Sequence, residues 1–112
     1  MDKTYKFLLD FGIPASLSGF DYLHDAVNMV IKDKTAIKRM TKAIYPGVAK
    51  LHGTTSQRAE RGMRHAIEVG FERVNPALSE SVFGNSVSYD SGKATNSEFI
   101  AAVVLRLRGE KA

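Results

Sequence analysis

The segment from Pro46 to Arg73 constrains the fold of this 112-residue chain more than any other. A short helix is expected over Pro46–His52, because proline in a first helical turn costs no backbone hydrogen bond. Gly53 follows, where a helix C-terminus favours a residue that tolerates a positive φ. A longer amphipathic helix is expected after it. A short helix, a glycine-bearing turn and a longer helix together predict a helix-turn-helix.

The longer helix has a polar beginning and two distinct faces. Thr54, Thr55 and Ser56 can each cap it through a side-chain oxygen, and Thr54 with Gln57 fits a capping box. Apolar residues then recur at helical spacing and form one stripe: Ala59, Met63, Ala66, Ile67, Gly70 and Phe71. The opposite face carries charged residues: Arg58, Glu60, Arg61, Arg64, His65 and Glu68. An amphipathic helix with arginines on its first turns suits DNA recognition in the major groove.

The charged face has a specific chemical interpretation. A planar guanidinium donates two hydrogen bonds to O6 and N7 of guanine, and a carboxylate accepts one from N4 of cytosine. Arg58, Glu60 and Arg61 lie on the first two turns, so we predict that they contact base edges. Arg64 and His65 lie one turn further along and are expected at phosphates. Arginine and glutamate on a surface helix also commonly form only a solvated face, so this alternative stays open at this point.

The positive charge of the chain is unevenly distributed. The net charge is +4, yet no acidic residue occurs between Asp33 and Glu60. That interval contains six cationic side chains: Lys34, Lys38, Arg39, Lys42, Lys50 and Arg58. An unneutralised basic surface attracts phosphates and releases counterions when it binds nucleic acid. Lysines can also serve only to keep a surface solvated, but the interval runs directly into the longer helix, which favours the nucleic-acid interpretation.

The rest of the chain predicts further helices and no sheet. Apolar periodicity and turn signals place them at five segments: Asp2–Phe11, Phe20–Lys32, Thr35–Ile44, Ala77–Phe83 and Asn96–Arg108. The third should end before Pro46, since a residue preceding proline disfavours the α conformation. Thr95 and Glu98 fit a capping box for the last helix, and Gly84–Gly92 is expected to be a loop. We therefore predict an all-α fold, a compact bundle of about six helices that contains the helix-turn-helix.

Several classes of protein are not expected. The chain contains no cysteine, so it has neither disulfides nor a thiolate metal site. No apolar run approaches a membrane span and no signal peptide is recognisable, so one cytoplasmic domain is expected. His24, His52 and His65 lack metal-ligand spacing, and neighbouring His24 and Asp25 should point in different directions. We expect no enzyme activity, no metal and no cofactor.

Three motifs carry a resemblance to a known family. They are GIPASLSGFDYLHDAVNMV from Gly12, IYPGVAKLHGTTSQRAERGMRHAIEV from Ile44 and TNSEFIA from Thr95, and they span nearly the whole chain in order. The chain resembles the effector domains of the stage-zero sporulation protein A family, response regulators of two-component signalling. The resemblance implies an all-helical domain that binds a TGTCGAA-like box in double-stranded DNA and regulates transcription at the nucleoid. It also implies contact with the sigma subunit of RNA polymerase.

The resemblance also assigns roles by position. Arg58, Glu60 and Arg61 match the base-reading positions of the family, and Arg64 and His65 match positions that contact the DNA backbone. The full set of predicted phosphate contacts comprises Lys50, Thr54, Thr55, Ser56, Arg64 and His65. On tandem boxes, two copies are expected to associate through the last helix.

Some features depart from the family. Its regulators carry an N-terminal receiver domain, and no part of this chain resembles one, so control by phosphorylation is not assumed. Gly62 and Gly70 replace residues that are usually alanine, which we expect to loosen the recognition helix, and Phe71 replaces a tryptophan. A function of a different class also stays open, namely a helical interaction module whose basic face binds an acidic protein partner. A steep salt dependence together with a preference for guanine-containing sites would distinguish the DNA reader from that module.

Overall fold

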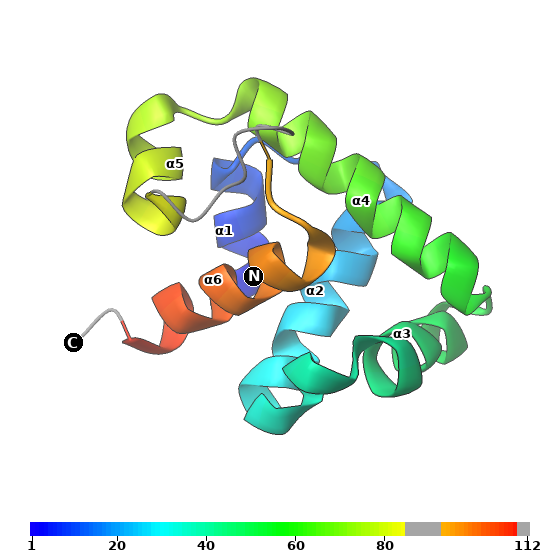
Figure 1. Ribbon diagram of the computed structural model, residues 1–112. Coiled ribbons are helices and arrows are strands. Elements are labelled where there is room, and N and C mark those ends of the chain that lie inside the picture. Colours follow the sequence, from blue (N-terminus) through cyan, green and yellow to red (C-terminus); the bar gives the residue numbers. More distant parts are fainter. Residues whose placement is uncertain (85–92, 110–112) are drawn as a thin grey trace.

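The computed structural model describes residues 1–84 and 93–109, and the regular structure within those ranges is entirely helical (Figure 1). The α-helices are α1 (Lys3–Asp10), α2 (Ser18–Lys32), α3 (Tyr45–His52), α4 (Ser56–Arg73), α5 (Pro76–Phe83) and α6 (Asn96–Gly109). A 3-10 helix, η1 (Lys34–Arg39), and a π-helical turn, η2 (Met40–Ile44), connect α2 to α3. The prediction of an all-α bundle of about six helices is confirmed.

Helix α2 lies at the centre of the bundle. It packs most extensively on α4 and α6, and α1 and α3 also contact it (Figure 1). Its residues Phe20, Leu23, Ala26 and Val27 have no exposed surface. Their helical spacing places them on adjoining sides of α2, where the neighbouring helices cover them. Full burial of a leucine or phenylalanine side chain contributes about 1.5–3 kcal/mol, so this helix anchors the core.

Two glycines allow α2 and α4 to cross at very short range. A Cβ atom on Gly19 would lie 2.0 Å from the carbonyl oxygen of Gly62 and 2.8 Å from the Cβ of Ala66. A Cβ atom on Gly62 would lie 2.8 Å from the ring of Tyr22. The helices approach this closely because neither glycine carries a side chain. Gly62 therefore has a packing role in α4 that its low helix propensity does not reveal.

Four phenylalanines join four parts of the chain into one aromatic cluster. Phe11 follows α1, while Phe71, Phe83 and Phe99 belong to α4, α5 and α6. The ring centroid of Phe11 lies 5.1 Å from that of Phe71, 5.8 Å from that of Phe83 and 5.3 Å from that of Phe99, each in an edge-to-face arrangement. Such pairs contribute about 0.5–1.5 kcal/mol each beyond the burial of their area. The cluster holds α5 against the rest of the bundle.

The connection between α2 and α3 differs from the prediction. The expectation of one helix over Thr35–Ile44 that ends before Pro46 is wrong. The chain runs instead through a 3-10 helix and a π turn directly into α3. Tyr45 has φ −61° and ψ −46°, which is the αR conformation despite the proline that follows. Proline in the first turn of α3 lacks only an N–H that needs no helical partner, and the π turn accommodates the change of helical register before it.

The last helix begins as the sequence predicts. Glu98 N–H donates to Thr95 Oγ1 at 3.1 Å, and Thr95 N–H donates to Glu98 Oε1 at 2.9 Å, which are the two bonds of a capping box. The loop expected at Gly84–Gly92 falls almost entirely on residues 85–92, which lie outside the described residues. Over the described part of the chain, none of the helices combines the length and the apolar character needed to cross a membrane.

Candidate nucleic-acid interface

A tight turn joins α3 to α4. Gly53 ends α3 in the left-handed region, with φ 63° and ψ 37°, as its position in the sequence predicts. The N–H groups of Gly53 and Thr54 both donate to the carbonyl of Ala49, which closes the last turn of α3. Ala49 is only 5% exposed, so a small residue lies at the packed end of this helix. The short helix, glycine turn and long helix therefore follow one another as the helix-turn-helix interpretation requires.

The N-cap of helix α4 is one residue later than predicted. The capping box expected between Thr54 and Gln57 is wrong, because Thr55 is the N-cap and its Oγ1 accepts from Arg58 N–H at 3.1 Å. Thr54 lies within the turn, where its N–H is used to close α3. Ser56 takes the first helical position. All three hydroxyl residues are therefore at the positive end of the α4 dipole, where an anion is favoured.

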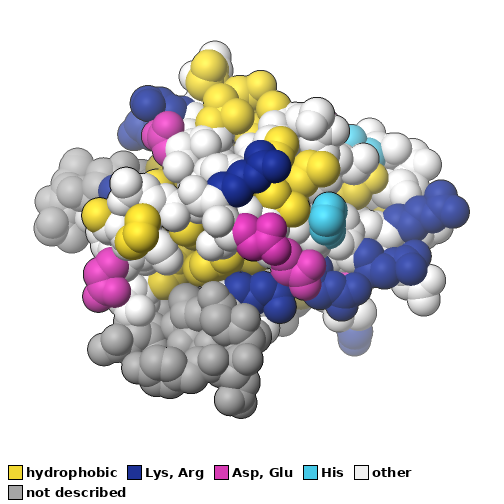
Figure 2. Space-filling view, turned by 90° about the horizontal axis from the view of Figure 1, so that it is seen from above, with side chains coloured by type: hydrophobic (Ala, Val, Ile, Leu, Met, Phe, Trp, Pro, Cys, Tyr) yellow, Lys and Arg dark blue, Asp and Glu magenta, His cyan; other side chains and the backbone are white. Residues whose placement is uncertain are grey.

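One face of α4 is exposed and basic. Arg58, Arg61, Arg64 and His65 are all exposed, at a spacing that places them along one side of the helix. The other side is buried through Ala59, Met63, Ala66, Ile67 and Gly70. Figure 2 shows Lys and Arg side chains gathered at the end of the molecule where α4 begins, on the right of the view. The predicted amphipathic division of this helix is confirmed.

Ion pairing divides the charged residues of this face into two groups. Within the described ranges, no hydrogen bond or ion pair engages the guanidinium group of Arg58 or Arg61. The guanidinium of Arg64 differs, because its Nη1 lies 3.3 Å from Glu60 Oε2. Glu60 is half-buried, and its backbone carbonyl accepts from Asn96 Nδ2 at 3.1 Å. The arginines at 58 and 61 are therefore free to meet a ligand, whereas Glu60 and Arg64 already have one another.

The predicted phosphate contacts come from α3, the turn and α4. They are Lys50 on α3, Thr54 and Thr55 in the turn, and Ser56, Arg64 and His65 on α4. Thr54 and Ser56 are half-buried and the others are exposed. Two further polar residues near this face escape prediction: Gln57, exposed in the first turn of α4, and Lys93, whose Nζ lies 3.5 Å from Glu68 Oε2. Gln57 could have been predicted from the sequence, since a glutamine amide in the first turn of a recognition helix can pair with adenine. Lys93 could not, because its approach to α4 depends on the tertiary fold.

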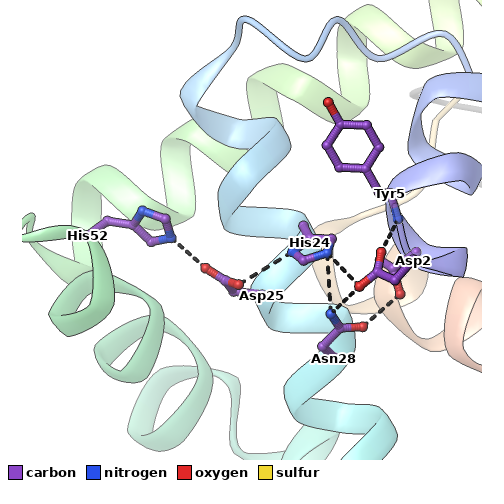
Figure 3. Close-up of polar contacts among 7 residues, drawn as sticks. Asp2, Tyr5, His24, Asp25, Asn28 and His52 are labelled. Atoms are coloured by element: carbon purple, nitrogen blue, oxygen red, sulfur yellow. Dashed lines mark hydrogen bonds and ion pairs between the residues drawn. The ribbon is translucent and has the colours of Figure 1, made fainter.

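A polar network connects the end of α3 to α2 and to the start of α1 (Figure 3). His52 Nε2, at the end of α3, lies 2.5 Å from Asp25 Oδ2 on α2. Asp25 Oδ1 lies 3.4 Å from His24 Nδ1, so the expectation that these neighbours point apart is wrong. His24 Nε2 lies in turn 2.8 Å from Asp2 Oδ2, just before α1. His24 and Asp25 thus form one run of polar contacts that links the end of α3 to the residue before α1.

The network changes the ionisation of Asp2. Partial burial alone would raise the pKa of this carboxyl, but hydrogen bonds from Tyr5 N–H, His24 and Asn28, together with the charge of His24, bring the pKa below its ordinary value. A carboxyl whose pKa is lower in the folded than in the unfolded chain stabilises the fold above its ordinary pKa. This contribution is lost as the pH falls through the lowered pKa. Asp2 therefore helps to hold α1 on α2 near neutral pH and not in acid.

A comparison of the chain with models of known protein families identifies its family. The family model described as "Sporulation initiation factor Spo0A C terminal" matches residues 4–107, nearly the whole chain. The chain belongs to this family. The family is that of the DNA-binding effector domain of a sporulation response regulator, and it is not a catalytic family. The resemblance inferred from the three sequence motifs is confirmed.

Proposed function

We propose that this domain binds double-stranded DNA sequence-specifically and regulates transcription, with the first turns of α4 inserted into the major groove. The observation that carries the proposal is the exposed pair Arg58 and Arg61, whose guanidinium groups have no partner within the described residues. Such groups contact a base without first breaking an intramolecular ion pair. Their place beside a capped helix start is the position from which recognition helices read base edges.

Each base-reading residue has its own chemical role. Arg58 and Arg61 each donate two hydrogen bonds to O6 and N7 of a guanine. Glu60 accepts from N4 of a cytosine, for which its carboxylate must leave Arg64. Arg64 moves to a phosphate when DNA binds, and this exchange of partner frees Glu60 at the same moment. A TGTCGAA-like box presents guanines and cytosines for these contacts.

The remaining contacts are to the DNA backbone. Thr54, Thr55 and Ser56 meet a phosphate at the positive end of α4, where hydroxyl and backbone N–H groups donate hydrogen bonds. Lys50 and His65, both exposed, meet further phosphates. Contacts of this kind set the register of the protein on the duplex but carry no sequence information by themselves.

Arginine-to-lysine variants separate base reading from plain electrostatics. Lysine keeps the positive charge but lacks the planar group that makes two hydrogen bonds to one guanine. Arg58→Lys and Arg61→Lys should each weaken binding to the preferred box by about 1–3 kcal/mol and relax the preference at one base pair. The affinity for unrelated duplexes should stay nearly unchanged. The measurement is a competition series over all single-base variants of the box at fixed salt concentration.

Arg73→Lys is the matched control. Arg73 is an exposed arginine in the last turn of the same helix, about 22 Å along the axis from Arg58 at the usual helical rise. This substitution should change neither the affinity nor the base preference. If both reader variants keep the full base preference, these arginines do not read guanine and the assignment of α4 fails. Equal binding of the wild-type protein to unrelated duplexes would instead favour the module that binds an acidic protein.

A further inference from the structure

A buried amide on α6 contacts both helices of the candidate interface. Asn96 is the first residue of α6 and is 7% exposed. Its Nδ2 donates to Tyr45 Oη at 3.1 Å and to the backbone carbonyl of Glu60 at 3.1 Å. Tyr45 is the first residue of α3, and Glu60 lies in the second turn of α4. One side chain from a third helix therefore bonds to the start of α3 and to the end of α4 that carries the base readers.

Both donors of this amide are used, and neither bond disturbs the helices that accept it. An asparagine side chain has two N–H donors, and each has its own acceptor here. The carbonyl of Glu60 has two lone pairs, so it can accept from Asn96 in addition to its partner within the helix. The bond therefore sets where this turn of α4 lies relative to α6 without unwinding α4.

Asn96 is itself held in position. The capping box of Thr95 and Glu98 defines the backbone at the start of α6. Phe99 and Ile100, in the same turn and the next, have no exposed surface. In Figure 1 the start of α6 lies beside α4 and α2, the two helices on which α6 packs most extensively. A shift of α4 away from α6 would therefore break the bond between the Glu60 carbonyl and Asn96.

The two ends of α3 are held by different helices. Asn96 of α6 bonds to Tyr45 at the start of α3, and Asp25 of α2 pairs with His52 at its end (Figure 3). The turn at Gly53 follows directly. Of the two residues that hold α3, only Asn96 also bonds to α4. Within the described residues, its amide is therefore the polar link that joins the starts of both α3 and α4 to α6.

Base reading requires the first turns of α4 to be positioned more precisely than attraction to phosphates does. A bidentate contact to guanine depends on positions held to about 0.5 Å, the tolerance of a pre-organised binding site. Attraction to phosphates acts over a screening length of about 8–10 Å at physiological salt. A small displacement of the first turns of α4 would therefore reduce sequence preference while leaving non-specific affinity nearly intact.

We propose that Asn96 is a positioning residue for base reading. Through Tyr45 and the Glu60 carbonyl it holds the turn of α4 that carries Arg58 and Arg61, although it lies buried and does not itself reach DNA. The inference rests on the proposed function, because it assigns to Asn96 the precision of contacts that the arginines make. It adds a residue outside the helix-turn-helix to those that determine specificity.

The test measures the Asn96→Ala protein with and without DNA. Without DNA, amide hydrogen exchange over residues 57–64 should become about tenfold faster relative to the amides of α2, because local opening of α4 costs less. With DNA, the ratio of affinities for the preferred box and for an unrelated duplex should fall about tenfold, the worth of roughly one good base contact. The affinity for the unrelated duplex should stay within about twofold of the wild-type value, since no charge is removed.

Thr4→Val is the control, and Tyr45→Phe is a milder variant. Among the described residues, Thr4 is the other buried polar one, 2% exposed, and its hydroxyl donates to Asn28 Oδ1 at 2.7 Å, which joins α1 to α2. Its replacement should lower stability yet leave both the exchange of α4 and the affinity ratio unchanged. Tyr45→Phe removes only the acceptor on α3, keeps the fold even where Asn96→Ala does not, and should lower the ratio by about threefold, part of one base contact.

The outcomes separate this inference from the proposed function. Unchanged exchange in α4 of a folded Asn96→Ala protein, or an unchanged ratio in Tyr45→Phe, overturns the positioning role. An equal loss of ratio in Thr4→Val also overturns it, because the effect would then be one of general stability. If the wild-type protein binds all duplexes equally, the proposed function fails. Faster exchange in Asn96→Ala would then show only that Asn96 stabilises α4 through its bond to α6, without a role in base reading.

Discussion

At the scale of single residues, the candidate interface contains an ion pair that the proposed DNA contacts would separate. The guanidinium of Arg64 and the carboxylate of Glu60 are one helical turn apart, and their side chains are 51% and 33% exposed. An ion pair of this kind contributes only about 0.3–0.5 kcal/mol, because water screens it. A phosphate can therefore displace Glu60 from Arg64 at little cost in free energy.

Replacing Arg64 with alanine tests its assignment to phosphate. Arg64→Ala should weaken binding to every duplex about equally, because a phosphate contact is independent of sequence. The slope of log affinity against log salt concentration should fall by roughly one unit. The measurement is a salt titration with the preferred box and with an unrelated duplex. Arg73→Ala, on the same helix, should leave the slope unchanged, and a loss confined to one DNA sequence would contradict the phosphate assignment.

The positions of side chains were predictable where their signal is local. The placement of Arg58, Arg61 and Arg64 on one exposed face follows from helical periodicity, and that face is observed. The bonds of Asn96 were not predictable, because their acceptors lie 51 and 36 residues away along the chain. The same holds for His52 and its carboxylate partner, which are 27 residues apart. Such contacts exist only once the helices have packed.

At the scale of elements, an apolar stripe with clear end signals was sufficient to predict a helix. Helix α4 has a full stripe, and its predicted and observed extents nearly coincide. The segment between Asp33 and Tyr45 has only a short apolar repeat, Ile37, Met40 and Ile44, and its 3-10 and π turns follow from the way the chain must pass from α2 to α3. Asp33 rather than Thr35 caps this segment, accepting from the N–H of Thr35 at 3.1 Å. The 3-10 and π turns were therefore decided by packing rather than by propensity, whereas the short helices α3 and α5 follow from local signals.

The close crossing of α2 and α4 predicts unequal effects for two glycine substitutions. Gly19→Ala would place a Cβ atom against a backbone carbonyl of α4, so the helices must separate, at a cost of about 3 kcal/mol. Gly62→Ala would come closer than 3 Å only to the ring of Tyr22, a half-buried side chain rather than backbone, and alanine gains about 1 kcal/mol of helix propensity. It should therefore change stability by less than about 1 kcal/mol. Urea unfolding midpoints at an unchanged slope measure both, and equal losses would contradict the crossing geometry.

At the scale of the whole molecule, the size of the domain and the end of α6 bear on how two copies would lie on DNA. The longest dimension is 36 Å, close to one turn of B-DNA at about 34–36 Å, so copies on successive turns would touch. The end of α6 lies across the molecule from the start of α4 (Figure 1). It exposes Leu105 to 72% beside a shallow apolar hollow lined by Val30, Ile37 and Val104. This surface would stay available with α4 in a DNA groove.

We propose that two copies bind tandem boxes cooperatively through this end of α6 while the free protein is monomeric. A contact of this limited size should raise the affinity for a second, adjacent box by about tenfold, which is a typical coupling between sites. Leu105→Ser should abolish that gain and leave binding to a single box unchanged. Leu9→Ser, at an exposed leucine of α1, is the matched control and should keep the gain. Titrations of single-box and tandem-box duplexes measure the coupling. A tight dimer in sedimentation without DNA, or full cooperativity in Leu105→Ser, would show that the copies associate by another surface.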